Sequence, residues 1–344
     1  MNYQENLKPP RLVAWETTGA CNLVCRHCRA EAQNTPDPDE LNSEQALILI
    51  RQLAQFSPLP MVILSGGEPL LRPDILELAS LGASLGLRML LSTNGTLLTS
   101  SLANKIKKAG VARLSLSLDA PEADAHDAFR GQIGSFKATV DGALILKKAG
   151  LPFQINSAIT AENIDQIEAI SDLALKLGAV AHHVFLLVPI GRAKVWGSQA
   201  LPPERYEEAL IKLRLREETT TLEFKATCAP QYNRIGHQLG LKPNLRSSRG
   251  CLGGQGFMFI GRGGQVGACG YLPLPAGNIL KDHPVDIYYH SGLFKELRTR
   301  TSYGERCREC EYFKICGGCR ARAYAAGDHL GADPLCPYRS AKEG

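Results

Sequence analysis

The stretch Cys21-Asn22-Leu23-Val24-Cys25-Arg26-His27-Cys28 carries the strongest signal in this 344-residue chain. Its three cysteines have the spacing C-x3-C-x2-C and follow an apolar segment at residues 11–17. Iron–sulfur clusters are held by cysteine thiolates, usually four per cluster. Three thiolates therefore leave one iron of a cubane open to a small molecule. A zinc knuckle is the weaker alternative, because structural zinc sites favour paired C-x2-C units.

Composition places the chain among soluble globular proteins. Its length suggests about two domains of roughly 150 residues each, and 44% hydrophobic with 21% charged residues is ordinary for such a protein. The net charge of +5 is not gathered into one tract, which gives little support to nucleic-acid binding. We expect no membrane partner, because no apolar run approaches about 18 residues.

The eleven cysteines are unevenly placed, with three at 21–28 and eight from residue 228 onward. The opening MNYQENLKPP shows no charged region followed by an apolar run, so we expect no signal peptide. In a cytoplasmic protein, cysteines in such clusters indicate metal ligands rather than disulfides. We therefore expect an oxygen-sensitive cytoplasmic protein.

Six short β-rich runs alternate with amphipathic helical patterns. The runs cover residues 11–17, 61–65, 88–92, 112–118, 152–159 and 180–189, and the helical patterns lie near 44–55, 74–86, 99–109, 135–149, 164–178 and 203–216. This alternation predicts an α/β fold with a parallel sheet and helices outside it. An open three-quarter barrel and a doubly wound sheet both fit. In either, the ligand site lies at the carboxyl ends of the strands.

Polar or glycine-rich segments follow five of these runs, at one end of the predicted sheet. They are the cysteine loop, Ser65-Gly66-Gly67-Glu68-Pro69, Thr93-Asn94-Gly95, Asp119-Ala120-Pro121 and Pro189-Ile190-Gly191-Arg192. Glycine lets a backbone approach a ligand closely, and a carboxylate such as Glu68 can accept hydrogen bonds from an ammonium. An ordinary strand-to-helix turn with Pro69 near the helix start is the alternative.

Further candidates lie on or after the later strands. Arg130 could pair with a carboxylate in bidentate fashion, or it could be a solvated loop arginine. Asn156, inside an apolar run, needs a buried partner, and Ser117 shares one face of its strand with Ser115. His182 and His183 point to opposite faces, so at most one faces the interior; a structural role is the more common one for such a pair.

The C-terminal third is rich in glycine and cysteine. Residues 257–260 and 265–269, joined by a glycine-rich turn, predict a hairpin with Cys251 and Cys269 at its two ends. A C-x2-C-x5-C-x2-C pattern follows from Cys307 to Cys319, and Cys336 is last. One or two structural zinc sites are the alternative, because zinc also takes four cysteines. A single cluster with leftover thiols also fits.

With these motifs the chain resembles the radical S-adenosylmethionine (SAM) superfamily. The spacing of Cys21, Cys25 and Cys28 and the sequence Gly66-Gly67-Glu68-Pro69 carry the resemblance; His27 stands where that superfamily often has an aromatic residue. The resemblance implies a partial (β/α)6 TIM-like barrel and a 4Fe–4S cluster whose open iron chelates the amino and carboxylate groups of SAM. It also implies SAM contacts from Gly66, Gly67, Glu68, Pro69, Thr93, Asn94 and Ser117. Arg130 and Asn156 are further candidate SAM contacts, with a core network as the alternative for Asn156.

The tail resembles the SPASM (SPASM/twitch) extension, which closes auxiliary 4Fe–4S clusters in many radical SAM proteins. This resemblance implies one auxiliary cluster on Cys307, Cys310, Cys316 and Cys336, and a second on Cys251, Cys269, Cys319 and Cys228. SPASM sequences normally have C-x3-C in the last pair, whereas x2 separates the pair here. The expected division is a radical SAM core barrel at 1–200, a linking helical segment at 201–250, and a small cysteine-rich Fe–S domain at 251–344.

Four longer stretches resemble the AhbD-type haem b synthases of the sirohaem-dependent pathway: RLVAWE at 11–16, HCRAEA at 27–32, TCAPQY at 227–232 and CGGCRARAY at 316–324. The resemblance implies conversion of Fe-coproporphyrin III to haem b. Two propionates become vinyls by oxidative decarboxylation, after a 5′-deoxyadenosyl radical abstracts a propionate hydrogen. Arg192, Arg320 and Arg322 are candidate partners for the substrate carboxylates, with ordinary surface charge as the alternative. A ferredoxin or flavodoxin would supply low-potential electrons.

Two enzyme classes and one non-enzyme class remain as alternatives. Haem d1 maturases and the radical SAM/SPASM maturases of peptides or proteins share parts of the pattern. Peptide maturases usually need a leader-binding segment, and only ten residues precede the first predicted strand near residue 11. An electron-transfer or zinc-binding module without catalysis would leave residues 66–69 unexplained.

Overall fold

The computed structural model of the protein describes residues 7–199, 201–242 and 250–339, and in these ranges ten strands form one sheet. The order across the sheet is β10-β9-β8-β1-β2-β3-β4-β5-β6-β7. The strands are β1 Leu12–Glu16, β2 Met61–Ser65, β3 Arg88–Ser92, β4 Arg113–Ser117, β5 Phe153–Ile159, β6 Ala181–Leu186, β7 Glu223–Thr227, β8 Phe257–Ile260, β9 Gln265–Gly267 and β10 Gly277–Asn278.

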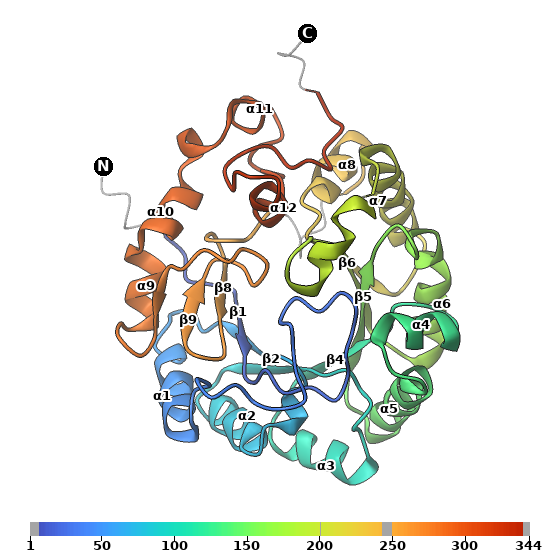
Figure 1. The fold of residues 1–344 in the computed structure, drawn as a ribbon, viewed down its shortest axis with the longest axis vertical. Helices are drawn as coiled ribbons and strands as arrows, with labels where there is room; N and C mark the ends of the chain where they lie inside the picture. The colour runs from blue at the N-terminus through green and yellow to red at the C-terminus, as the bar shows by residue number, and fades with distance from the viewer. Residues whose placement is uncertain (1–6, 200, 243–249, 340–344) are drawn as a thin grey trace.

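Strands β1 to β7 run parallel in chain order and curve into a partial barrel with helices around the outside (Figure 1). This confirms the TIM-like alternative over the doubly wound sheet. The helices are α1 Ser43–Leu53, α2 Ile75–Ser84, α3 Ser100–Lys108, α4 Ala123–Arg130, α5 Ser135–Ala149, α6 Ile167–Leu177, α7 Pro203–Glu217, α8 Gln231–Gln238, α9 Pro284–His290, α10 Gly292–Arg298, α11 Glu305–Arg308 and α12 Arg320–Ala325.

The alternation of side chains along the barrel strands separates a sealed face from an accessible one. In β4, Leu114 and Leu116 are fully buried, whereas Ser115 and Ser117, which alternate with them, are only half-buried. Strands β2 and β3 show the same alternation. Because successive side chains point to opposite faces of a strand, the buried leucines pack under the helices. The serines therefore face the barrel interior.

The segment 201–250 differs from the predicted linking helical segment. It contains β7, which pairs in parallel with β6 and makes a seventh barrel strand where six were predicted. Helix α4, between β4 and β5, was also not predicted.

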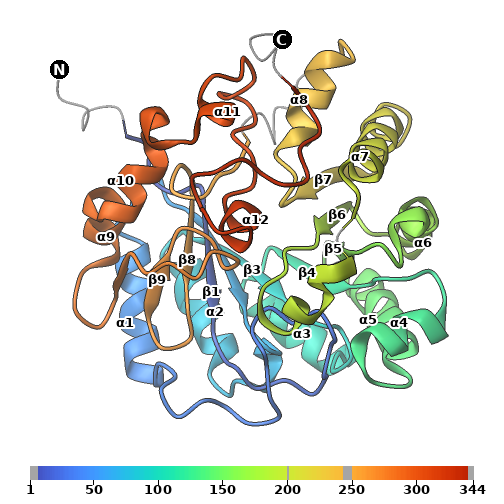
Figure 2. The same cartoon turned by 45° about the horizontal axis from the view of Figure 1, so that its top comes forward.

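The predicted hairpin is present as β8 and β9, and it does not stand apart from the barrel. Strand β8 pairs in parallel with β1, so the strands of the tail continue the sheet of the barrel. Figures 1 and 2 show α12 between this hairpin on one side and α8 on the other. The tail therefore bridges the two edge regions of the partial barrel. No helix within the described ranges is long and apolar enough to cross a membrane.

Candidate functional site

The loop between β1 and α1 brings the first three cysteines to the carboxyl end of the barrel. Cys21 and Cys25 are buried and Cys28 is half-buried. Burial raises the pKa of the Cys21 thiol to about 11, and repulsion from Glu68, Cys25 and Cys28 adds to the rise. The thiols of Cys25 and Cys28 are therefore close enough to Cys21 to interact with it electrostatically. Because metal ligation requires thiolates, loading this site releases protons.

Gly66 and Gly67 are needed where β2 meets the cysteine loop. A Cβ on Gly67 would lie 2.2 Å from the Ala20 carbonyl oxygen, and Gly66 has a φ of +136°. The Gly67 amide donates to the Thr18 carbonyl at 2.8 Å. Glycine permits close approach, as predicted, but the partner in the structure is the backbone of the cysteine loop rather than an open ligand space.

The Glu68 carboxylate is fully buried and is used by the protein itself. It accepts hydrogen bonds from Thr93 Oγ1 at 2.8 Å and from the amides of Asn94 at 2.7 Å and Leu70 at 3.0 Å. Burial raises its pKa to about 7, although these hydrogen bonds oppose the rise. Glu68 thus joins the loops after β2 and β3, and its contact with the SAM ammonium stays a prediction. Pro69 begins a short 3-10 helix, as the turn alternative required.

The cysteine loop is further tied to the loop after β3. The Asn94 side-chain amide donates to Asn22 Oδ1 at 2.8 Å. His27 stacks on Phe129 with ring centroids 4.4 Å apart, which is the packing an aromatic residue would provide. Burial lowers the pKa of His27 to about 3, so its ring is neutral. Thr93 and Asn94 therefore lie beside the cysteine loop, where the resemblance placed SAM contacts.

Arg130 lies at the end of α4 and is buried, so it is not a solvated loop arginine. Its Nε is 2.6 Å from Asp119 Oδ2, and its guanidinium donates to the Cys25 sulfur at 3.7 Å. Burial raises the pKa of Cys25, and the positive charge of Arg130 opposes that rise. The Arg130 guanidinium is thus held by Asp119 and Cys25, and its pairing with a SAM carboxylate stays a prediction.

Arg192 follows β6 and also supports the cysteine loop. Its guanidinium donates to the carbonyl oxygens of Cys25 at 2.9 Å and Ala32 at 3.0 Å. It thus holds the backbone that carries the three thiols, and its predicted role as a partner of substrate carboxylates stays a prediction. Ser117 and Asn156 are register partners on β4 and β5 and are half-buried on the barrel interior, so their predicted SAM contacts stay predictions.

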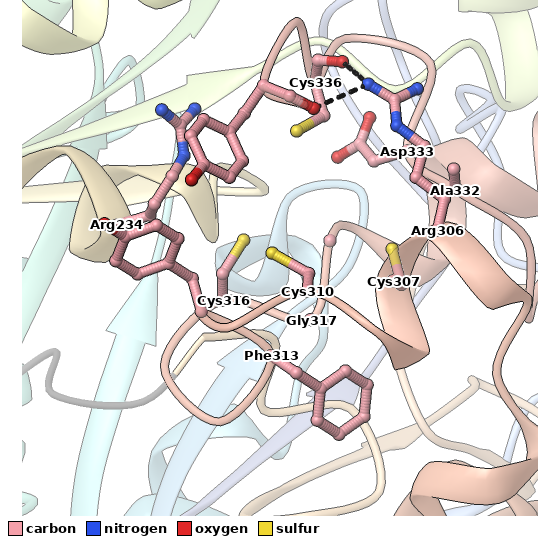
Figure 3. Close-up of a pocket in the computed structure, with 13 residues that line it drawn as sticks. Arg234, Arg306, Cys307, Cys310, Phe313, Cys316, Gly317, Ala332, Asp333 and Cys336 are labelled. Carbon is pink, nitrogen blue, oxygen red and sulfur yellow. Dashed lines mark hydrogen bonds between the residues drawn. The ribbon is translucent and has the colours of Figure 1, made fainter. Parts of the chain in front are cut away.

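The first tail group surrounds one cavity. Cys307, Cys310, Cys316 and Cys336 all line it, and Figure 3 shows their sulfur atoms around the same central space. Arg306 closes one side, donating to the carbonyl oxygens of Cys336 at 2.6 Å and Tyr338 at 3.0 Å. These are the four cysteines that the resemblance assigned to one auxiliary cluster.

The second tail group gathers where β7 meets α12. The Cys228 thiol donates to the sulfur of Cys319, which lowers the pKa of Cys319 and raises that of Cys228. The charges of Cys251 and Cys319 help raise the pKa of Cys269 to about 12, chiefly a result of burial. Cys228 has a φ of 56°, a left-handed conformation that is uncommon outside glycine. The four cysteines assigned to the second cluster therefore also lie together.

The donor sets fit iron–sulfur clusters in number and kind. Among the described residues, no three or more His, Cys, Asp or Glu side chains are placed to share a single metal ion. In a cubane each iron takes its own thiolate, so the sulfurs that would hold a cluster stand further apart than the ligands of one ion. One group of three thiols and two groups of four provide ligands for one open cluster and two closed ones.

Arg320 and Arg322, predicted as substrate partners or surface charge, are both buried inside the tail. Arg320 donates to the carbonyl oxygens of His329 at 3.0 Å and Gly331 at 2.8 Å. Arg322 pairs with the fully buried Asp333 at 2.8 Å. Asp333 also accepts the Cys319 amide at 2.9 Å. Both arginines thus stabilise the segments that carry the tail cysteines, and their predicted contacts with substrate stay predictions.

Arg322→Met is expected to lower the free energy of unfolding by about 3–5 kcal/mol, because it leaves the buried Asp333 carboxylate unpaired. Thermal unfolding and iron content, measured without oxygen, check this. The matched control is Arg205→Met, which breaks a pair with Asp165 whose side chains are 43% and 80% exposed; it should cost less than about 1 kcal/mol. Equal losses in both variants would contradict the prediction.

Comparison with known proteins agrees with this geometry. Residues 15–174 match the model of the radical SAM superfamily. The structure superposes on SuiB of Streptococcus suis bound to S-adenosylmethionine with a TM-score of 0.76, at 18% identity, over 96% of this chain and 77% of that one. The barrel and its cysteine loop therefore define a radical SAM enzyme.

Similar proteins with known names show which family within this superfamily the chain belongs to. The chain is 44% identical to AdoMet-dependent heme synthases of Oleidesulfovibrio alaskensis and Methanosarcina barkeri, over 97% of this chain and 88% and 98% of theirs. It belongs to the family of the AdoMet-dependent heme synthases.

Proposed function

We propose that the protein converts Fe-coproporphyrin III to haem b by oxidative decarboxylation of two propionates to vinyls. The observation that supports this most strongly is the 44% identity to named haem synthases over 97% of this chain. The three cysteine groups agree with it, because the reaction needs both a radical source and an electron acceptor.

When bound, the open cluster and SAM supply a 5′-deoxyadenosyl radical that takes a hydrogen atom from the propionate, after which CO2 leaves, the vinyl double bond forms and one electron is released. The chain's own residues prepare the site. Cys21, Cys25 and Cys28 would hold the open cluster, and Arg130 and Arg192 fix the loop that carries them. Ser117 and Asn156, which lie on the barrel interior, would orient SAM.

The auxiliary groups would take up the released electron. The group of Cys228, Cys251, Cys269 and Cys319 is the one beside the end of a barrel strand, because Cys228 directly follows β7. A low-potential donor such as ferredoxin or flavodoxin would reduce the open cluster, and such donors act in the cytoplasm, where we place the protein.

Anaerobically reconstituted protein, reduced and supplied with SAM and Fe-coproporphyrin III, is expected to form haem b, with two CO2 and two 5′-deoxyadenosine per haem. Mass spectrometry of the porphyrin and assay of 5′-deoxyadenosine check this. Conversion of a different tetrapyrrole would assign the chain to a haem d1 maturase-like reaction. Turnover of a peptide alone would assign it to the peptide maturases. Zinc in place of iron, without SAM cleavage, would contradict enzymatic function.

A further inference from the structure

Two adjacent histidines on β6 have opposite environments. His182 packs under the helices, and its ring nitrogens lie 2.9 Å from Ser157 Oγ and 2.9 Å from Ser171 Oγ. His183 faces the barrel interior, with Nδ1 2.8 Å from Gln154 Nε2. Its Nε2 is buried and has no hydrogen-bond partner among the residues that the structure describes. His182 therefore has a structural role, whereas one ring nitrogen of His183 makes no hydrogen bond with the described residues.

Neighbouring groups fix which His183 nitrogen carries the proton. The Arg113 guanidinium, which can only donate, lies 3.4 Å from Gln154 Oε1. The Gln154 amide group must therefore face Asn156 and His183, where it donates to Nδ1. Burial and the charges of Lys225 and Arg113 keep the pKa of His183 well below its usual value, so the ring is neutral. Its Nε2–H is a hydrogen-bond donor that lacks an acceptor.

Lys225 on β7 is the register neighbour of His183 and faces the same interior. Its ammonium has no hydrogen bond or ion pair with any residue in the described ranges. The nearby carboxylate of Glu223 is 3.9 Å from the guanidinium of Arg113, so it is shared with another cation. Burial and the charge of Arg11 lower the pKa of Lys225, and the charges of Glu223 and Cys228 oppose that fall.

The sheet register places this donor pair between the two kinds of cofactor position. Ser117, Asn156, His183 and Lys225 are successive register partners on β4, β5, β6 and β7. The first two are the predicted SAM contacts, and Cys228 of the second auxiliary group lies three residues after Lys225. A molecule in this row would lie between the radical source and the electron acceptor.

We propose that His183 and Lys225 form a carboxylate-binding pair that takes one propionate of the tetrapyrrole substrate. The pair offers a neutral N–H and an ammonium, which is a donor-only set suited to an anion. It adds a donor pair to Arg192, Arg320 and Arg322, whose guanidinium groups already donate to protein acceptors. The inference rests on the proposed function for the identity of the substrate.

The test measures binding of Fe-coproporphyrin III and of its tetramethyl ester to the reconstituted full-length protein by absorbance titration. Lys225→Gln is expected to raise the Kd for the acid about 10-fold or more, as loss of a charged hydrogen bond implies, and to leave the Kd for the ester unchanged. Lys225→Arg should restore most of the acid binding. The matched control is Lys212→Gln, an exposed lysine on α7, which should bind both compounds as the unaltered protein does.

The outcomes distinguish failure of the proposed carboxylate-binding pair from failure of the proposed reaction. If Lys225→Gln and His183→Leu, with normal iron content and melting temperature, bind the acid as tightly as the unaltered protein, the pair is overturned while the function stands. If the unaltered protein binds the acid and Lys225→Gln does not, but no haem b forms, the pair holds and the proposed reaction fails. If the unaltered protein does not prefer the acid over the ester, both are overturned.

Discussion

Cys25→Ala is expected to reduce the reductive cleavage of SAM below detection while the tail clusters remain. Cys25 is the central thiol of the loop, and it is the one that Arg130 and Arg192 support through its sulfur and its carbonyl oxygen. A cubane left with two protein thiolates and an exchangeable ligand is not retained, because cluster binding depends on the full thiolate set. The site that would chelate SAM is then lost.

The measurement is 5′-deoxyadenosine formation with dithionite and SAM, together with iron and sulfide content. Iron should fall by about one cubane, roughly a third of the total for three clusters. Val24→Ala is the matched control in the same loop, because Val24 is 60% exposed and offers no ligand. SAM cleavage by Cys25→Ala at more than about a tenth of the control rate would contradict the role assigned to the loop.

The fold was predictable where side-chain alternation follows an apolar core. Residues 61–65 and 88–92 were predicted with the bounds of β2 and β3, because their helix-facing residues are large and apolar. Strand β7 was missed because only Phe224 packs under a helix, while Glu223 and Lys225 face a polar interior. Helix α4 was missed because it is short and built largely of alanine and charged residues.

The site residues were predictable where ligand chemistry fixes the spacing of cysteines along the sequence. They were much less predictable where the burial of a side chain decides its role. The cysteine groups follow from ligand number and the resemblance. The arginines do not, because a guanidinium is engaged or free according to distant partners: Arg192 binds a carbonyl oxygen 167 positions earlier, and Arg322 needs Asp333. Lys225 was overlooked, although a lysine three residues before a ligand cysteine was a signal that could have found it.

Cys228→Ala and Cys336→Ala are expected to remove different clusters. Cys336 lines the cavity with Cys307, Cys310 and Cys316 (Figure 3), whereas Cys228 is hydrogen-bonded to Cys319 at the end of β7. Each variant should lose about one cubane of iron, and the double variant about two. Electron paramagnetic resonance of the reduced proteins should then show two distinct signals, each missing from one single variant.

The rate of haem b formation by the two cysteine variants tests whether the two groups of tail cysteines have different functions. Cys228→Ala should abolish it, because the affected group lies beside the proposed substrate row and would accept the electron released with CO2. Cys336→Ala should retain a measurable rate if its cluster only passes electrons onward. Ala229→Gly, next to Cys228 but without a ligand atom, is the control for local disturbance. If both cysteine variants lose the same resonance signal, the eight tail cysteines serve a single cluster and the two-group assignment is wrong.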